Sequence, residues 1–158
     1  MTDASFKDGR EAPLNLGAED ADDLQVIATL AQDAVFPVTE MTWRPSERRF
    51  ALLLNRFRWE DKEAASRRGR AFERVQAVLV FDSVLSVASQ GIDRSDKDMI
   101  LSLLSVAFEP AEDGSGQMLL TLAGDGAIRL SVEAIDVTLK DVTRPYKAPS
   151  GHAPHHPE

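Results

Sequence analysis

Two arginines and a tryptophan at the end of an apolar stretch are the residues best suited to bind a partner. In RRFALLLNRFRWE, residues 48–60, Arg56 and Arg58 follow an alternating run of apolar side chains, and Trp59 comes next. Arginine beside an aromatic ring is a composition favoured at protein interfaces. The alternative is structural, with the aromatic rings closing one end of the core and the arginines in water or paired with carboxylates. Both readings stay open, and Arg56, Arg58 and Trp59 are the candidate binding residues.

Histidine and cysteine chemistry is missing from the part of the chain expected to fold. The sequence has no cysteine, and its three histidines, His152, His155 and His156, lie among prolines near the end. A serine–histidine triad, a cysteine nucleophile and a histidine-bound zinc ion are therefore excluded from the folded part. We expect no catalytic residues, no metal site and no cofactor.

Two other charged stretches have ordinary structural explanations. Asp93, Asp96 and Asp98 in GIDRSDKD lack the glycine and the glutamate of a calcium loop, so turn and cap roles explain them. The basic stretch RRGRAFER, residues 67–74, could bind an anionic partner, but a solvated loop with paired arginines is the simpler reading. Residues 60–70 are expected to form a charged loop between strands.

Overall charge and hydrophobicity limit the class of protein. The chain has 158 residues, of which 43% are hydrophobic, and this suits a single soluble domain. Its net charge of −8 argues against nucleic-acid binding, which needs a basic surface. No apolar run approaches the roughly 18 residues of a membrane span, and the N-terminus lacks a secretory signal. We therefore expect a cytoplasmic protein that binds neither nucleic acid nor membrane.

The elements that must position these residues are mostly strands. One helix is predicted in GAEDADDLQVIATLAQDAV, which has carboxylates in its first turn and ends before Pro37. Beyond it, the hydrophobic pattern becomes that of strands, most clearly in AIRLSVEA. Strands are predicted at residues 38–43, 49–59, 72–81, 84–90, 101–109, 117–123 and 127–140. The predicted core residues are Leu52, Leu54, Ile128, Leu130 and Val132.

Changes of phase within these runs predict bent strands. The apolar set changes face near Asn55, near Leu103 and at Ala134, with no turn residue at these points. We therefore expect an α+β fold, a mainly antiparallel, strongly bent β-sandwich or partly closed barrel with one N-terminal helix. Residues 95–109 are open to two readings, a helical turn followed by a strand, which we favour, or a single helix.

One folded domain is expected at residues 13–143, between two flexible tails. Residues 1–12 are polar and unpatterned, and residues 144–158 contain prolines that interrupt regular structure.

Five segments together resemble a known family. The chain resembles the DUF2948 family of alphaproteobacterial proteins in DLQVIATLAQDAV, RRFALLLNRFRWE, RVQAVLVFDSVLSVASQGID, LSLLSVAFEP and LTLAGDGAIRLSVEAIDVTLKDV. The resemblance covers about residues 14–143. It implies a bacterial, cytoplasmic protein with no assigned activity, and it offers no catalytic residues to transfer.

Three functions fit these observations. The first is a non-catalytic module that binds or regulates another protein, and its partner would be an unidentified protein. The second is a small-ligand-binding β domain that uses a barrel mouth or the space between sheets. The third is an enzyme restricted to carboxylate, arginine and lysine chemistry, which we rank last because histidine and cysteine are missing.

Overall fold

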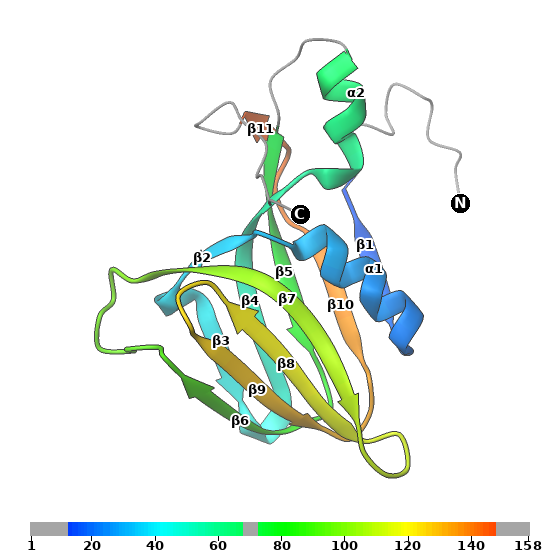
Figure 1. Cartoon of the computed structure of the whole chain (residues 1–158), viewed down its shortest axis with the longest axis vertical. Coiled ribbons are helices and arrows are strands. Elements are labelled where there is room, and N and C mark those ends of the chain that lie inside the picture. The colour runs from blue at the N-terminus through cyan, green and yellow to red at the C-terminus, as the bar shows by residue number, and fades with distance from the viewer. Residues whose placement is uncertain (1–12, 68–72, 148–158) are drawn as a thin grey trace.

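The helices and strands follow the predicted order closely (Figure 1). The computed structural model describes residues 13–67 and 73–147. The helices are α1 (Ala21–Ala31) and α2 (Lys62–Arg67), with short 3-10 helices η2 (Val38–Glu40), η3 (Pro45–Glu47) and η4 (Trp59–Asp61). The strands are β1 (Asn15–Ala18), β2 (Val35–Pro37), β3 (Met41–Arg44), β4 (Arg49–Phe57), β5 (Glu73–Phe81), β6 (Val84–Gln90), β7 (Ile100–Pro110), β8 (Gly116–Leu122), β9 (Ala127–Val132), β10 (Val137–Asp141) and β11 (Tyr146–Lys147).

The strands form one antiparallel sheet that does not close. Its order is β1-β10-β5-β4-β2-β7-β8-β9-β6, with β3 also beside β4 and β11 also beside β5. Every pairing in the described residues is antiparallel, which confirms the predicted character of the sheet. β1 and β6 are the two ends of this path, and within the described ranges they do not pair with each other.

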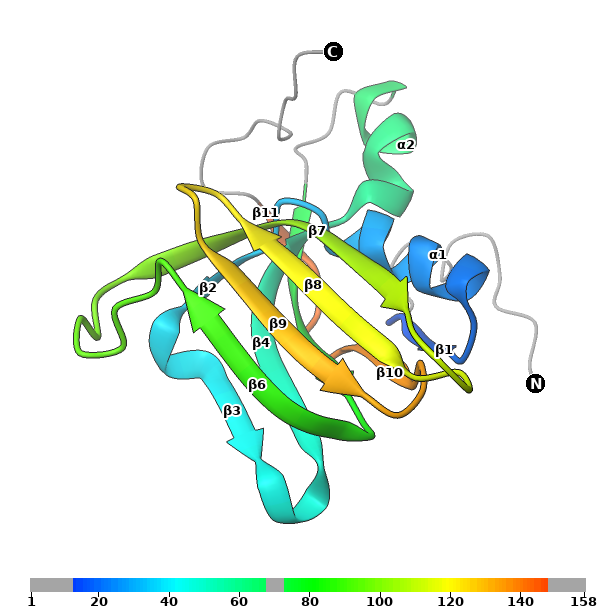
Figure 2. The ribbon, with the colours of Figure 1, turned by 60° about the horizontal axis from the view of Figure 1, so that its bottom comes forward.

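The sheet folds over so that its two halves share one core. The half made of β7, β8, β9 and β6 lies across β4, β5 and β10, as both views show (Figures 1 and 2). A single hydrophobic cluster takes residues from both halves, including Leu52 and Leu79 from one and Leu120 and Leu130 from the other. The five predicted core residues, Leu52, Leu54, Ile128, Leu130 and Val132, are all at most 1% exposed, so the alternation predicted the inward face.

Helix α1 packs its apolar stripe against β1 and β7. The side chain of Asp20 caps its N-terminus by accepting a hydrogen bond from the Asp23 backbone N–H at 2.8 Å. Carboxylates in the first turn also favour the helix dipole, as predicted. The helix is shorter than the predicted stretch because residues 35–37 pair with β7 and β4 as strand β2.

The structure resolves the ambiguous segment 95–109 and locates one predicted bulge. Hydrogen-bonded turns occupy the residues before Ile100, where Met99 N donates to Asp96 O, and β7 then runs as a strand, so a single helix is wrong. The register of β7 against β8 shifts between Leu103 and Ser105, which confirms the predicted slip.

Two predicted bends are wrong. The register of β4 against β5 is continuous from Phe50 to Phe57, so β4 does not change phase at Asn55. At Ala134 the chain does not bend within one strand; it leaves β9 in one half of the sheet and enters β10 in the other. β9 and β10 are separate strands that pack on the shared core from different halves of the sheet. The positions that point inward are therefore fixed independently in each strand.

The prediction of a single helix missed α2, which lies where a charged loop was expected. β1 and β11 were also not predicted, and β11 pairs with β5 beyond the predicted domain end at residue 143. Both strands are short and lie at edges, so their sequences carry little alternation. The predicted tail at residues 1–12 lies outside the described residues, as does the part of the predicted tail 144–158 that follows β11, residues 148–158.

Candidate functional site

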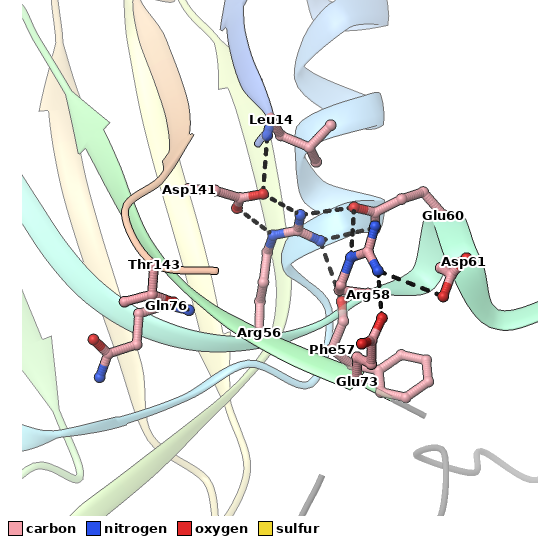
Figure 3. Close-up of polar contacts among 10 residues, drawn as sticks. All are labelled: Leu14, Arg56, Phe57, Arg58, Glu60, Asp61, Glu73, Gln76, Asp141 and Thr143. Atoms are coloured by element: carbon pink, nitrogen blue, oxygen red, sulfur yellow. Dashed lines mark hydrogen bonds and ion pairs between the residues drawn. The ribbon is translucent and has the colours of Figure 1, made fainter. Parts of the chain in front are cut away.

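An ion-pair network around Arg56 occupies the end of β4 (Figure 3). Arg56 is 0% exposed, and it continues the inward phase of Leu52 and Leu54. Its guanidinium donates to both oxygens of Asp141, from Nε to Oδ1 and from Nη2 to Oδ2, each at 2.9 Å. It also donates to Glu60, from Nη1 to Oε1 at 2.9 Å and from Nη2 to Oε2 at 2.8 Å. Two carboxylates therefore hold this guanidinium through paired hydrogen bonds.

Burial alone would lower the pKa of Arg56, because it disfavours the charged form. Hydrogen bonds and charge attraction from Glu60 and Asp141 outweigh burial and raise the pKa of Arg56 above its ordinary value. Asp141 also accepts a hydrogen bond from the Leu14 backbone N–H at 2.9 Å, which joins the residue before β1 to the network (Figure 3). The guanidinium is thus permanently charged, and its charge is compensated inside the protein.

Arg58 is the second cation of this network and is 3% exposed. Its Nη1 lies 2.5 Å from Glu73 Oε1 and 3.5 Å from Asp61 Oδ2, and its Nε lies 3.9 Å from Glu60 Oε2. Glu60 therefore contacts both arginines (Figure 3). The network ties the end of β4 to η4, to the start of β5 and to the end of β10.

Trp59 is half-buried and links three elements. Its indole Nε1 donates to the Gln32 carbonyl oxygen, just after α1, at 2.9 Å. Its ring meets the ring of Phe57 edge-on, with centroids 4.8 Å apart, and the Lys62 ammonium lies 5.5 Å from its centroid. Phe57 is fully buried. The aromatic pair therefore packs the end of β4 against the segments that follow α1 and precede α2.

These contacts favour the structural alternative for the three candidate residues. Both guanidiniums are buried and paired with carboxylates, so neither is free to meet a partner at the surface. Trp59 keeps a partly exposed surface. A binding role for Arg56, Arg58 and Trp59 stays a prediction, and the surfaces of the sheet are the better places to look for one.

The acidic partners of Arg56 were missed by the sequence reasoning, although a signal for one of them exists. Asp141 follows Val137 and Leu139 at the inward positions of β10, as Arg56 follows Leu54 in β4. A charged residue in the apolar phase of a strand needs a buried partner of opposite charge. Two such residues of opposite sign could have been paired from their phases, whereas Glu60, in η4, carries no comparable signal.

Of the two remaining charged stretches, the one with Asp93, Asp96 and Asp98 forms hydrogen-bonded turns. Asp93 Oδ1 accepts hydrogen bonds from the backbone N–H and the hydroxyl of Ser95, which confirms a turn role. These bonds lower the pKa of Asp93, the hydroxyl having the larger effect. Of the basic stretch 67–74, residues 68–72 lie outside the described residues. In the parts that are described, no group of histidine, cysteine, aspartate or glutamate has the arrangement of a metal site.

The outer face of β6, β9 and β8 carries a shallow depression of about 330 Å³. Cross-strand rows form its floor, with Ala88 beside Arg129 and Gln90 beside Ala127. The Arg129 guanidinium lies at this depression and donates to Glu109 at 3.0 Å. The floor consists largely of small and polar side chains, so backbone and side chains of a bound molecule could approach the sheet closely.

Comparisons with known proteins give one match. A family model described as "Protein of unknown function (DUF2948)" matches residues 14–156, which is nearly the whole chain. No curated protein matches the chain, and no solved structure matches it. Neither helix within the described ranges is long and apolar enough to cross a membrane.

Proposed function

Since this chain belongs to the DUF2948 family, whose description assigns no activity, we propose a function from its surface: a non-catalytic module that binds another protein. The binding element is β6, which takes up an extended segment of the partner as an additional strand. Such strand addition uses backbone hydrogen bonds for affinity and side-chain pockets beside the strand for specificity.

The exposed edge of β6 is the observation that carries this proposal. β6 ends the sheet, and among the described residues it pairs with β9 alone. Its seven residues, VLSVASQ, include no charged side chain and no proline. Natural edge strands are usually protected from pairing by charges, prolines, bulges or a covering element. β6 has a register shift between Val84 and Ser86, which leaves the edge from Ser86 to Gln90 regular.

Other edges of the sheet are less suited to strand addition. β1 has four residues, and α1 packs beside it. β3 also has four residues and carries Arg44. β6 is therefore the longest uncharged edge strand in the part of the chain that the structure describes.

The depression beside β6 supplies the second requirement, a place for partner side chains. It borders the edge through Ala88, Ser89 and Gln90. The same depression supports a second candidate function, the binding of a small ligand. Its volume of about 330 Å³ lies near the lower end of ligand pockets, roughly 300–1,000 Å³. We rank this function second because the depression is open and shallow.

A pair of matched variants tests the leading proposal. Ser86 on β6 and Ser131 on β9 lie directly opposite each other. Ser86→Lys places a charge on the edge, whereas Ser131→Lys places the same charge one strand further in. The tagged wild type and both variants are used to capture proteins from the native host, followed by mass spectrometry. We expect the wild type and Ser131→Lys to capture the same partner, and Ser86→Lys to lose it.

Equal capture by both variants, at equal melting temperatures, would contradict strand addition at β6. A thermal-shift screen against metabolites and nucleotides tests the second function, because a ligand that binds the folded state raises its melting temperature. If one compound stabilises the protein at modest concentration, small-ligand binding becomes the favoured function in place of protein binding.

The proposal also covers the architecture of the sheet, the location of the protein and the class of its partner. We describe the two halves of the sheet as the layers of a β-sandwich left open between β3 and β6, supported by the core that they share. We place the protein in the cytoplasm of alphaproteobacteria, as the family resemblance implies. A partner that is a protein and not a nucleic acid agrees with the net charge of −8.

A further inference from the structure

The two central strands of one half of the sheet are apolar on both faces. Their inward residues form the core, while Ala51 and Leu53 of β4 and Val78 and Val80 of β5 point outward. These four outward residues are only partly buried. The solvated face of an antiparallel sheet is commonly polar, so apolar side chains there are unusual. An apolar outer face at the centre of a sheet is therefore a candidate docking surface.

The charged side chains at the outward strand positions of this face are all cations. Outward positions of β3, β4, β5 and β10 include Arg44, Arg49, Arg74 and Lys140, and none of the outward positions within these strands is a carboxylate. The chain as a whole has a net charge of −8. The outward positions within these strands are thus basic, and the carboxylates that pair with two of these cations, Glu47 and Asp82, lie just outside the strands.

A depression of about 290 Å³ lies where the apolar strip meets two of these cations. Its floor is Ala51, Val78 and Val80, and its rim includes Arg44 and Arg49. The volume is at the lower limit for a small-molecule pocket, roughly 300 Å³. It is better suited to one or two inserted side chains than to a whole cofactor.

Arg44 and Arg49 lie directly opposite each other in the register of β3 and β4. Like charges at such positions destabilise a sheet. Each arginine has one carboxylate partner: Arg44 Nη1 lies 3.2 Å from Glu47 Oε2, and Arg49 Nε lies 2.8 Å from Asp82 Oδ1. Each contact uses one nitrogen of a guanidinium that has five N–H donors. The remaining donors are available to an anion at the rim of the depression.

We propose that this depression binds an acidic, amphipathic segment of a partner protein, with an apolar side chain on Ala51, Val78 and Val80 and carboxylates at Arg44 and Arg49. The cations select carboxylates, and the apolar floor selects a peptide that carries an apolar side chain beside them. A nucleic acid would use the cations but would leave the apolar floor without a partner. Insertion into a membrane needs apolar side chains that protrude, whereas these are recessed beside two arginines.

Two double variants with the same change of charge separate this site from general electrostatics. Arg44→Gln with Arg49→Gln removes both cations of the rim. Arg48→Gln with Arg94→Gln is the control, because Arg48 and Arg94 are also exposed and line neither depression. A library of random peptides displayed on phage is selected on the immobilised wild type, and the strongest peptides are synthesised and measured by titration calorimetry.

The expected peptides combine carboxylates with apolar side chains. Their affinity should fall about tenfold or more in the Arg44/Arg49 variant, because two charged contacts are lost, and should change less than about threefold in the control. Failure to select such peptides, or equal affinity for the two variants, would overturn the proposal. Binding of the wild type to phosphatidylglycerol vesicles that is lost in the Arg44/Arg49 variant would overturn it in favour of a membrane surface.

Filling the depression provides a test that leaves every charge in place. Ala51→Phe occupies the floor, while Ala107→Phe adds the same ring at an exposed position of β7. Peptide affinity should be lost in Ala51→Phe and kept in Ala107→Phe, with both variants folded by thermal melting. Retained affinity in a folded Ala51→Phe would contradict the site. Ser86→Lys should leave peptide affinity unchanged, so this proposal and strand addition at β6 fail independently.

Discussion

The guanidinium of Arg56 forms a two-point ion pair with the carboxylate of Asp141, and the two residues are 85 positions apart in the chain. Arg56 is fully buried and Asp141 is 7% exposed. The pair joins the ends of β4 and β10, two strands that do not pair with each other because β5 lies between them. It therefore connects, through side chains, strands that backbone hydrogen bonds do not connect directly.

Removing Arg56 should be strongly destabilising. Arg56→Ala leaves the Asp141 carboxylate buried without its cation, a change that typically costs about 3–5 kcal/mol. Arg49→Ala is the control, since its partner Asp82 is near the surface and exposed pairs contribute about 0–1 kcal/mol. Urea denaturation of both variants measures the difference. Similar small losses for the two would mean that the buried pair does not stabilise the fold.

The two members of the pair should also be coupled. Arg56→Met leaves the buried Asp141 without its cation, and Asp141→Leu leaves Arg56 with Glu60 as its remaining ion-pair partner. The double variant places apolar groups in contact instead. The double variant should be less destabilised than the sum of the two single variants, by about 0.5–3 kcal/mol in free energy of unfolding. Strict additivity in this double-mutant cycle would show that Glu60 alone compensates Arg56.

The indole of Trp59 should contribute through its hydrogen bond. Trp59→Phe keeps an aromatic ring but removes the donor to the Gln32 carbonyl, and a typical hydrogen bond contributes about 0.5–1.5 kcal/mol. Trp43→Phe is the control, because Trp43 is also half-buried and no hydrogen bond of its indole is found among the described residues. Chemical denaturation followed by far-UV circular dichroism compares them. A cost for Trp59→Phe no larger than that for Trp43→Phe would be inconsistent with this role.

Leu130 should be among the costly residues to truncate. It is 0% exposed at the centre of β9, and large-to-small core substitutions to alanine cost about 2–5 kcal/mol. Leu85→Ala provides the same substitution at a position that is 50% exposed, where surface changes are usually within about 0.5 kcal/mol. A loss below about 1 kcal/mol for Leu130→Ala in urea unfolding would mean that the core is not packed as described.

Tyr146 is the one tyrosine of the chain, so its titration can be followed directly by ultraviolet absorbance. Burial raises the pKa of its hydroxyl above the ordinary value, and the charge of Arg74 opposes this in part. The folded state therefore keeps the proton to higher pH than the unfolded state. This contributes stability that is present below the unfolded pKa and is lost as the pH rises through the folded pKa.

The pH at the midpoint of the Tyr146 titration should accordingly be higher in the native protein than in the denatured chain. Arg74→Gln should move it further up, because the cation that favours tyrosinate is removed. A native midpoint at or below the denatured one would show that Tyr146 is not held against β5.

Much of the strand layout could be read from local pattern. Alternation in AIRLSV placed Ile128, Leu130 and Val132 in the core, and the slip near Leu103 marked a real shift of register. The aspartates before the first helix predicted its start, where Asp20 caps it. These features depend on residues close together in the chain, so their physical causes are visible in the sequence.

The candidate site was decided by contacts between residues distant in the chain. From the sequence, Arg56 and Arg58 could either bind a partner or lie in water or paired with carboxylates. Their burial depends on Asp141, Glu60 and Glu73 being brought beside them. The basic outer face likewise exists because β3, β4, β5 and β10 are neighbours that present their cations on one side.

The sequence by itself thus determined where most of the longer strands, helix α1 and the predicted core positions lie, because alternation and capping act within a few residues. Tertiary structure decided which strands pair, that α2 forms in a segment that resembles a loop, and that Arg56 is buried. The reason is energetic: the cost of desolvating a charged side chain is offset only when partners of opposite charge surround it. Those partners come from β10, η4 and β5, and their proximity is a property of the folded chain.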